Sequence, residues 1–270
     1  MKQPTRNFDD EYLRVLRDVL IYGKDTPDRT GTGTRRLFGP QMEFDIEGQF
    51  PLLTTKKINY KAVINELVWM VSLGSTDVKW LQDQGHTFWD DWCHEDGTIG
   101  PGYGKQFRDC KGVDQVKAVV NSIKKDPYGR RHVISLWQPD EIEDMALPPC
   151  HGLVIQFFVE DDKYLSCKMY QRSGDMFLGV PWNIAFYSLL TRLIAQLAGL
   201  TAKTFIHTIG DAHIYLNHID QVKEQLTRKP KPYPYLVIGG DLHSIDDFRY
   251  ECVQVIGYDP HPSIKAEISA

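Results

Sequence analysis

The feature that most constrains the fold of this chain is a series of short strand patterns with one long apolar helix pattern among them. Strands are expected where β-branched and aromatic residues gather, over residues 132–137, 153–159, 164–170 and 204–209. Before the last of these, residues 190–198 carry apolar side chains at helical spacing and end at Gly199. Because strands and helices are mixed and the connections are short, we expect an α+β fold with a mixed β-sheet flanked by helices.

Further regular patterns extend this fold in both directions. A helical stripe over residues 12–20 ends at Gly23, where a left-handed cap is expected. Alternating apolar and acidic residues over 42–46 predict a half-buried strand, and the segment ending at 250–258 predicts another. Residues 60–73 predict a buried helix. Since no repeat or low-complexity linker divides the chain, we expect a single domain over residues 1–270.

Composition narrows the classes of function. The net charge of −5 argues against nucleic-acid binding by bulk charge. The five cysteines are scattered and form no C-x-x-C pair, which favours a reducing compartment over a disulfide framework or a metal site. No apolar run is long enough to span a membrane, and the N-terminus lacks a signal-peptide pattern. We therefore expect a soluble, cytoplasmic protein with no metal and no membrane partner.

The most reactive candidate is Cys150, a lone thiol in the proline-stiffened segment LPPCH at 147–151. A cysteine acts as a nucleophile only as the thiolate, which needs nearby positive charge or hydrogen-bond donors. Arg172, or the tandem Arg130 and Arg131, could supply that charge. The alternative is a buried cysteine that only packs, and this segment alone leaves both interpretations open.

Two arginine-containing segments could bind an anion. The loop DRTGTGT at 28–34 combines Arg29 with hydroxyls and glycine-freed amides, although it lacks the Gly-Lys-Ser/Thr ending of a Walker motif. A plain turn is the alternative. Arg130 and Arg131 precede a strand, where adjacent side chains point in opposite directions. They serve one site only if the backbone is irregular or a second subunit takes part; otherwise they are a solvated pair.

Three more polar residues stand out. Glu66 is the one carboxylate in its apolar helix, so it must be hydrogen-bonded, protonated or functional. His213 and Tyr215 lie on one side of an extended segment, where they could hold a sugar hydroxyl or cap a helix.

Taken together, these segments resemble the thymidylate synthase family from about Tyr12 to the C-terminus. The matching stretches are DRTGTGT at 28–34, FPLLTTKK at 50–57, NELVW at 65–69, YGKQFR at 103–108, RR at 130–131, LPPCH at 147–151, YQRSGDMFLGVPWNIA at 170–185, GDAHIY at 210–215 and GYDPHPSIKAE at 257–267. Ordered matches of this length are highly specific.

The resemblance implies a role for each matching residue in a reaction between dUMP and 5,10-methylenetetrahydrofolate. Cys150 would attack C6 of the uracil ring, and Glu66 and Tyr103 would assist proton transfers at O4 and C5. The dUMP contacts would come from Arg29, Arg172, Ser173, Asp175, Asn183, His213 and Tyr215, with Arg130 and Arg131 donated by the partner of a homodimer. The folate contacts would come from Lys56, Trp89, Asp175 and the C-terminal Ala270.

The resemblance also implies a sheet that packs at the homodimer interface. It favours dTMP and dihydrofolate as products, because the catalytic and nucleotide-contacting positions match. Asn183 would read the uracil edge, donating to O4 and accepting from N3, whereas an aspartate there would suit cytosine.

Several positions depart from the family pattern. The usual sequence PFNIASY is Pro-Trp-Asn-Ile-Ala-Phe-Tyr at 181–187, and Gly102 and Phe107 replace larger residues. One extra residue follows Cys150, and the chain ends in Ile-Ser-Ala rather than in valine or isoleucine. These changes lie where water access is controlled, so the rival is a dUMP hydroxymethylase, in which water traps the exocyclic methylene and yields 5-hydroxymethyl-dUMP and tetrahydrofolate.

Two other classes remain as alternatives. A Cys-His hydrolase would use Cys150 with a histidine, but His151 points away on an extended chain and no orienting partner is evident. A non-catalytic nucleotide- or RNA-binding protein would bind dUMP without turnover, and the net charge offers this interpretation no support.

Overall fold

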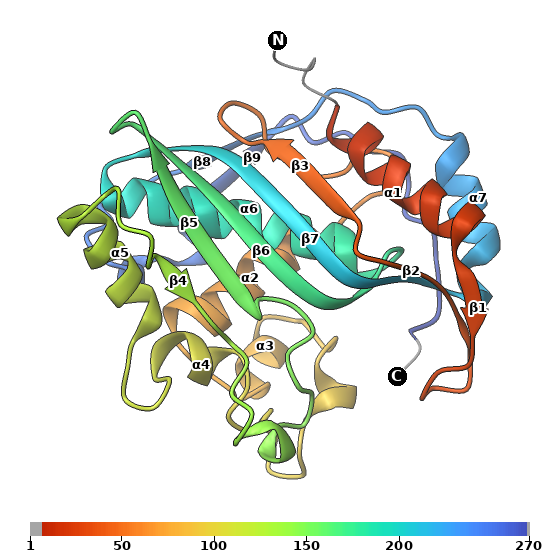
Figure 1. The fold of residues 1–270 in the computed structure, drawn as a ribbon, viewed down its shortest axis with the longest axis horizontal. Coiled ribbons are helices and arrows are strands. Elements are labelled where there is room, and N and C mark those ends of the chain that lie inside the picture. The colour runs from red at the N-terminus through yellow and green to blue at the C-terminus, as the bar shows by residue number, and fades with distance from the viewer. Residues whose placement is uncertain (1–6, 269–270) are drawn as a thin grey trace.

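The computed structural model describes residues 7–268, which form an α+β domain around a mixed sheet (Figure 1). The strands of this sheet are β1 (Lys24–Thr26), β2 (Thr34–Phe38), β3 (Gln41–Asp45), β4 (Val133–Ile134), β5 (Val154–Glu160), β6 (Tyr164–Asp175) and β7 (Thr201–Tyr215). A separate two-stranded sheet contains β8 (Tyr235–Ile238) and β9 (Val253–Ile256). The helices are α1 (Phe8–Tyr22), α2 (Tyr60–Leu67), α3 (Lys79–Asp83), α4 (Gly104–Arg108), α5 (Gln115–Lys125), α6 (Gly179–Ala198) and α7 (Ile219–Thr227).

The sheet is mixed because one pair of its central strands runs parallel. Its order is β1-β2-β7-β6-β5-β4, and β3 pairs with β7 alongside β2. Strands β6 and β7 are parallel from Tyr164 opposite Thr201 to Asp175 opposite His213, whereas the other described pairs are antiparallel. A parallel pair needs a long crossover, and α6 provides it. The C-terminal ends of β6 and β7 therefore lie side by side.

Helix α6 forms the centre of the molecule. It packs against β6 and β7 on one side and against α2 and α5 on others, so that it lies behind the sheet in Figure 1. A helix covered on several sides is apolar around much of its circumference, as the long run of buried residues in α6 shows. The ring of Tyr187 in α6 stacks on the ring of Phe205 in β7, with centroids 6.2 Å apart. The core is thus a sheet, a buried helix and an outer helical layer.

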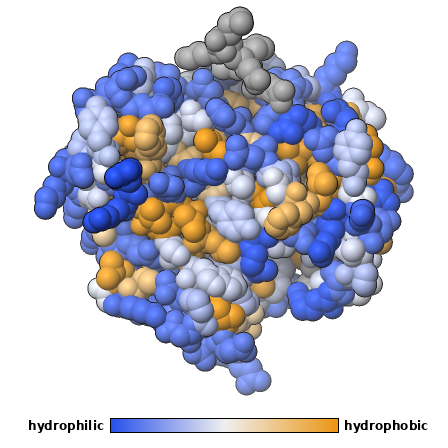
Figure 2. All heavy atoms as spheres, viewed as in Figure 1, coloured by the Kyte–Doolittle hydropathy of each residue, from blue (hydrophilic) through white to orange (hydrophobic). Residues whose placement is uncertain are grey.

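In the part of the chain that the structure describes, no helix covers the other face of the sheet over β5 and β6 (Figure 1). Strand β5 alternates strictly, burying one set of side chains and exposing the other. Val154, Phe158 and Tyr170 are exposed on these strands, and Figure 2 shows hydrophobic patches across this side of the molecule. An exposed apolar sheet face of this kind is typical of a protein–protein interface.

The structure confirms the α+β architecture, while several element boundaries differ from the sequence predictions. The helix over 60–73 begins as α2 and continues as a π-helical turn, Val68–Ser72. The prediction of a left-handed cap at Gly23 is wrong. The φ of Gly23 is −65°, because the chain continues directly into the extended backbone of β1. The strand over 132–137 shrinks to β4, since the Ser135 N–H bonds to the Gln115 side chain at 3.0 Å instead of a neighbouring strand. Within residues 7–268, no helix is both long enough and apolar enough to cross a membrane.

A glycine substitution tests the packing behind the Cys150 loop. Gly152 has a φ of +71°, and an added Cβ would lie 2.4 Å from Tyr187 Oη and 2.6 Å from Leu136 Cδ1. Gly199, with a φ of +76°, has open space around it and is a matched control. We expect Gly152→Ala to lower the free energy of unfolding by about 1–3 kcal/mol more than Gly199→Ala, because overpacking adds to the shared backbone strain. Urea denaturation at one protein concentration measures both; equal losses would contradict the packing.

Candidate active site

Cys150 lies in the loop before β5, and the end of β6 holds this loop in place. The Cys150 carbonyl accepts hydrogen bonds from the backbone N–H groups of Arg172 at 2.8 Å and Ser173 at 3.4 Å. The Arg172 guanidinium reaches back over the loop to the carbonyls of Pro149 and Pro148, at 3.4 and 3.5 Å, and remains exposed. The structure therefore brings together the thiol, an arginine and a serine that the sequence separates by more than twenty residues.

Tyr103 makes a polar contact with the thiol. Its hydroxyl lies 3.6 Å from Cys150 Sγ and accepts a hydrogen bond from the Cys150 N–H at 3.0 Å. Its backbone has a φ of +29°, a costly conformation for a residue with a side chain. The fully buried ring packs on Trp89 at 5.6 Å and on His151 at 4.7 Å, and these contacts keep the hydroxyl at the sulfur.

The electrostatic environment of the thiol is mixed. Burial raises the pKa of Cys150, while the Tyr103 hydrogen bond and the Arg172 charge act to lower it, and the Glu66 charge acts to raise it. A raised pKa means that the thiol form predominates at neutral pH. Tyr103 and Arg172 are therefore the groups in this site that favour formation of the thiolate.

His151 has a different partner. Its Nδ1 lies 2.7 Å from the Tyr187 hydroxyl, and burial lowers its pKa to about 3, so the ring is neutral. The neighbour of Cys150 Sγ is Tyr103 rather than this imidazole. The geometry thus gives no support to a Cys-His hydrolase.

Glu66 is buried in α2 and each of its oxygens accepts one indole hydrogen bond. Trp89 Nε1 donates to Oε1 at 2.8 Å, and Trp182 Nε1 donates to Oε2 at 2.6 Å. Burial raises the pKa of Glu66 to about 7, although both hydrogen bonds act to lower it. A carboxyl group poised near neutrality can both accept and release a proton.

A hydrogen-bond network fixes the amide of Asn183, in the first turns of α6. Gln171 Nε2 donates to the Ser173 carbonyl at 2.9 Å, which leaves Gln171 Oε1 to accept from Asn183 Nδ2 at 3.1 Å and from His207 Nε2 at 2.7 Å. Since a carbonyl can only accept, these donor and acceptor assignments follow from one another. Among residues 7–268, no other side-chain hydrogen bond uses Asn183 Oδ1 or its second amide hydrogen. Burial lowers the pKa of His207 to about 3, so this ring is neutral.

The ends of β6 and β7 gather the predicted sugar contacts. Asp175 pairs with His213 across the parallel strands, and the Met176 N–H donates to the His213 carbonyl at 2.7 Å. The His213 and Tyr215 rings are 5.3 Å apart, on the same side of β7. Burial raises the pKa of the Tyr215 hydroxyl, and the nearby Asp175 charge raises it further. The predicted juxtaposition of His213 and Tyr215 is confirmed.

The loop at 28–34 is an organised turn that leads into the same region. Asp28 accepts hydrogen bonds from the Gly33 N–H and from the Thr30 hydroxyl, both at 2.7 Å. The loop ends where Thr34 of β2 pairs with Tyr215 of β7, and Arg29 is exposed. A cation is thereby available beside the end of β7.

Arg130 and Arg131 are exposed at the turn between α5 and β4. Among residues 7–268, no hydrogen bond or ion pair of these side chains joins them to the residues around Cys150. Within residues 7–268, the structure does not bring them to the site.

Lys56 is oriented toward the interior of the protein. Its ammonium group donates to the Phe177 carbonyl and lies 3.6 Å from the centre of the Phe177 ring, and burial lowers its pKa to about 7. Asp175 accepts the Phe177 N–H at 2.8 Å through one oxygen. The predicted folate contact Ala270 lies outside the described residues.

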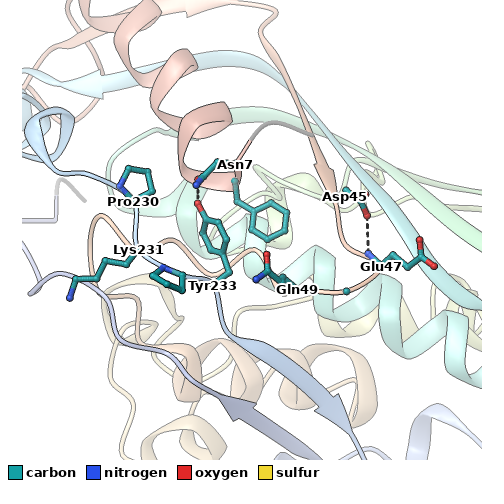
Figure 3. Close-up of a pocket in the computed structure, with 10 residues that line it drawn as sticks. Asn7, Asp45, Glu47, Gln49, Pro230, Lys231 and Tyr233 are labelled. Carbon is teal, nitrogen blue, oxygen red and sulfur yellow. Dashed lines mark hydrogen bonds between the residues drawn. The ribbon is translucent and has the colours of Figure 1, made fainter. Parts of the chain in front are cut away.

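A depression elsewhere on the surface has a volume of about 900 Å³ (Figure 3). Its lining residues come from the start of α1, from the end of β3 and the segment that follows it, and from the segment that precedes β8. Tyr233 donates a hydrogen bond to Asn7 in its wall. Its lining includes none of the predicted site residues. The Cys150 region is therefore the candidate site, because the thiol and the buried polar networks of Glu66 and Asn183 are there.

The sequence predictions missed three supporting residues: Gln171, His207 and Trp182. The first two are polar side chains at buried positions of strands, a pattern that signals a hydrogen-bond network. Trp182 gave no such signal, since a tryptophan in an apolar helix usually packs. Among residues 7–268, no cluster of three or more His, Cys, Asp or Glu side chains is arranged to hold a metal ion.

Comparison with known families agrees with this geometry. The family model described as thymidylate synthase matches residues 10–270, nearly the whole chain. The match confirms the resemblance that the sequence motifs indicate, and members of this family carry out folate-dependent one-carbon transfer to dUMP. The chain belongs to the thymidylate synthase family.

Proposed function

We propose that this protein transfers the one-carbon unit of 5,10-methylenetetrahydrofolate to C5 of dUMP and produces dTMP and dihydrofolate. The observation that carries the proposal is the position of Cys150, whose sulfur lies at the Tyr103 hydroxyl and whose loop is bonded to Arg172 and Ser173. A nucleophile beside a phosphate-binding pair suits a phosphorylated small molecule with an electrophilic ring.

Covalent attack would activate the substrate. Addition of the Cys150 thiolate to C6 makes C5 nucleophilic toward the methylene carbon, and later elimination of the sulfur restores the double bond. Glu66 would exchange a proton with O4 through ordered water, and Tyr103, whose hydroxyl lies 3.6 Å from Cys150 Sγ, would assist removal of the C5 proton. The hydride that completes the methyl group comes from the folate, which leaves as dihydrofolate.

The binding roles follow the same geometry. Arg29, Arg172 and Ser173 would hold the phosphate, His213 and Tyr215 the 3′-hydroxyl, and Asn183 the uracil edge. In the described chain, Asp175 uses one oxygen for the Phe177 N–H, so the other can accept an N–H from substrate or pterin. Trp89 and Lys56 would line the folate side, the latter after turning outward from Phe177.

The rival product is 5-hydroxymethyl-dUMP. Phe186 and Phe107, two of the departures from the family pattern, are fully buried, and the Phe186 ring packs 6.1 Å from His151. Large apolar side chains that fill the core exclude water rather than admit it. This packing favours hydride transfer, and hence dTMP.

A homodimer would complete the site. The uncovered face of β5 and β6 exposes apolar side chains suited to a second copy of the chain (Figure 2). Arg130 and Arg131, exposed and unattached to the Cys150 region of their own subunit, would reach the phosphate of the partner.

The reaction itself is tested by incubating the protein with dUMP and 5,10-methylenetetrahydrofolate. We expect dTMP by mass spectrometry, together with the near-ultraviolet absorbance of dihydrofolate. Cys150→Ala should abolish turnover and leave dUMP binding within about threefold, because it removes only the nucleophile. A 5-hydroxymethyl product without dihydrofolate would establish the rival reaction, and normal turnover by the variant would exclude the nucleophile.

Base selection is tested with Asn183→Asp. A carboxylate cannot donate to Gln171 Oε1 or to uracil O4, but it can accept from the cytosine amino group. We expect the ratio of kcat/KM for dUMP to that for dCMP to fall by about tenfold or more. Asn59→Asp, at the N-cap of α2, makes the same chemical change away from this network and should leave the ratio unchanged.

Subunit sharing is tested by mixing two inactive variants. Cys150→Ala lacks the nucleophile, and the double substitution Arg130→Ala with Arg131→Ala lacks the proposed phosphate contacts. After subunit exchange, an equal mixture should regain about a quarter of the wild-type sites, since half of the dimers are mixed and each has one intact site. If both variants fold and exchange subunits but the mixture stays inactive, the two arginines do not cross the interface.

A further inference from the structure

The carboxyl group of Glu66 is held by tryptophans from two distant parts of the chain. Trp89, in the segment after α3, donates to one oxygen at 2.8 Å, and Trp182, in the first turn of α6, donates to the other at 2.6 Å. Glu66 is only 5% exposed. Both distances are those of strong hydrogen bonds to a carboxylate.

Trp182 is supported for this role by its own packing. Its ring stands edge-on to Phe88 with centroids 5.0 Å apart, and the next residue is Asn183. The phenylalanine usual in the family pattern at this position would keep an aromatic ring there but would have no N–H to donate. The donor to Glu66 Oε2 is therefore specific to the tryptophan of this chain.

We propose that Trp182 is a positioning residue that, together with Trp89, fixes Glu66 with one oxygen on each indole. This inference rests on the proposed function, in which Glu66 transfers protons at the pyrimidine. A carboxylate with a donor on each oxygen cannot rotate without breaking a hydrogen bond. Each oxygen keeps a second lone pair, so a proton or an ordered water can bind either oxygen while the orientation of the carboxyl group stays fixed.

The other titratable groups near Glu66 do not stabilise its negative charge, so this stabilisation comes from the two indole N–H groups. Cys150, from the loop before β5, and Tyr187, from α6, interact electrostatically with Glu66, and both become negative when they ionise. His86, after α3, lies against Asn65 at 2.9 Å instead, and burial lowers its pKa. Because these groups do not stabilise the carboxylate, loss of the Trp182 N–H should raise the pKa of Glu66.

The direct test is a titration of Glu66 that does not depend on turnover. The protein is labelled with ¹³C at glutamate carboxyl groups, and Glu66→Gln identifies the resonance by its disappearance. We expect Trp182→Phe to move the midpoint upward by about one pH unit or more, since one charge-stabilising donor is lost. Replacing Trp182 with benzothienylalanine, which has sulfur in place of N–H, should give the same shift with the ring shape preserved and covers the case in which the phenylalanine variant is unstable.

Trp92→Phe is the matched control. Trp92 packs against Trp89 with ring centroids 6.0 Å apart, but the Glu66 oxygens accept from the other two indoles. This variant should leave the midpoint unchanged. An unmoved midpoint in both Trp182 variants would overturn the positioning role, as would an equal shift in Trp92→Phe.

A second measurement separates this inference from the proposed function. The pH profile of tritium release from [5-³H]dUMP should move upward in the Trp182 variants, in step with the titration. A merely structural role would lower the rate at all pH values without moving the profile. If the titration shifts but the wild-type protein releases no tritium, the proposed reaction fails while the Glu66 clamp stands.

Discussion

The parallel pairing of β6 with β7 is the constraint on which the candidate active site depends. It places Asp175 beside His213 and leaves the end of β6 free to bond the Cys150 carbonyl through the N–H groups of Arg172 and Ser173. A parallel pair requires a long crossover, which is why the buried helix α6 separates the two strands in sequence. That helix in turn carries Trp182 and Asn183 into the site. The parallel pairing thus positions the candidate nucleophile, two of the predicted phosphate contacts (Arg172 and Ser173) and the predicted base contact.

Around this frame, buried polar groups are oriented by hydrogen bonds rather than by charge pairs. Glu66 accepts from two indoles, and Asn183 is fixed through Gln171, His207 and a backbone carbonyl. Burying such groups is costly unless each has a partner, so their networks specify one arrangement of the core. Burial also keeps His207 neutral and raises the pKa of Glu66 to about 7. Burial therefore makes the hydrogen-bond networks necessary, and it also gives Glu66 a pKa at which a carboxyl group can accept and release a proton.

Much of the fold and site could be predicted from local sequence patterns, and the errors have physical causes. The alternation over 42–46 became β3, and the stripe before Gly199 became the end of α6. Gly23 does not adopt a left-handed cap, because the following strand requires an extended backbone, which a glycine can also adopt. The tandem Arg130 and Arg131 are exposed before β4, apart from the Cys150 region, and their contact with a phosphate across a subunit interface stays a prediction.

The sequence by itself determined the family and indicated Cys150 as the candidate nucleophile with the types of side chain expected around it, because ordered motifs record chemistry that few alternatives satisfy. The tertiary structure decided the hydrogen-bond partners: Trp182 on Glu66, Tyr103 on Cys150, and Gln171 between Asn183 and His207. Such contacts join residues far apart in the chain, and their distances and directions depend on how β6, β7 and α6 pack. Local patterns carry no record of that packing, so only the folded chain shows which group orients which.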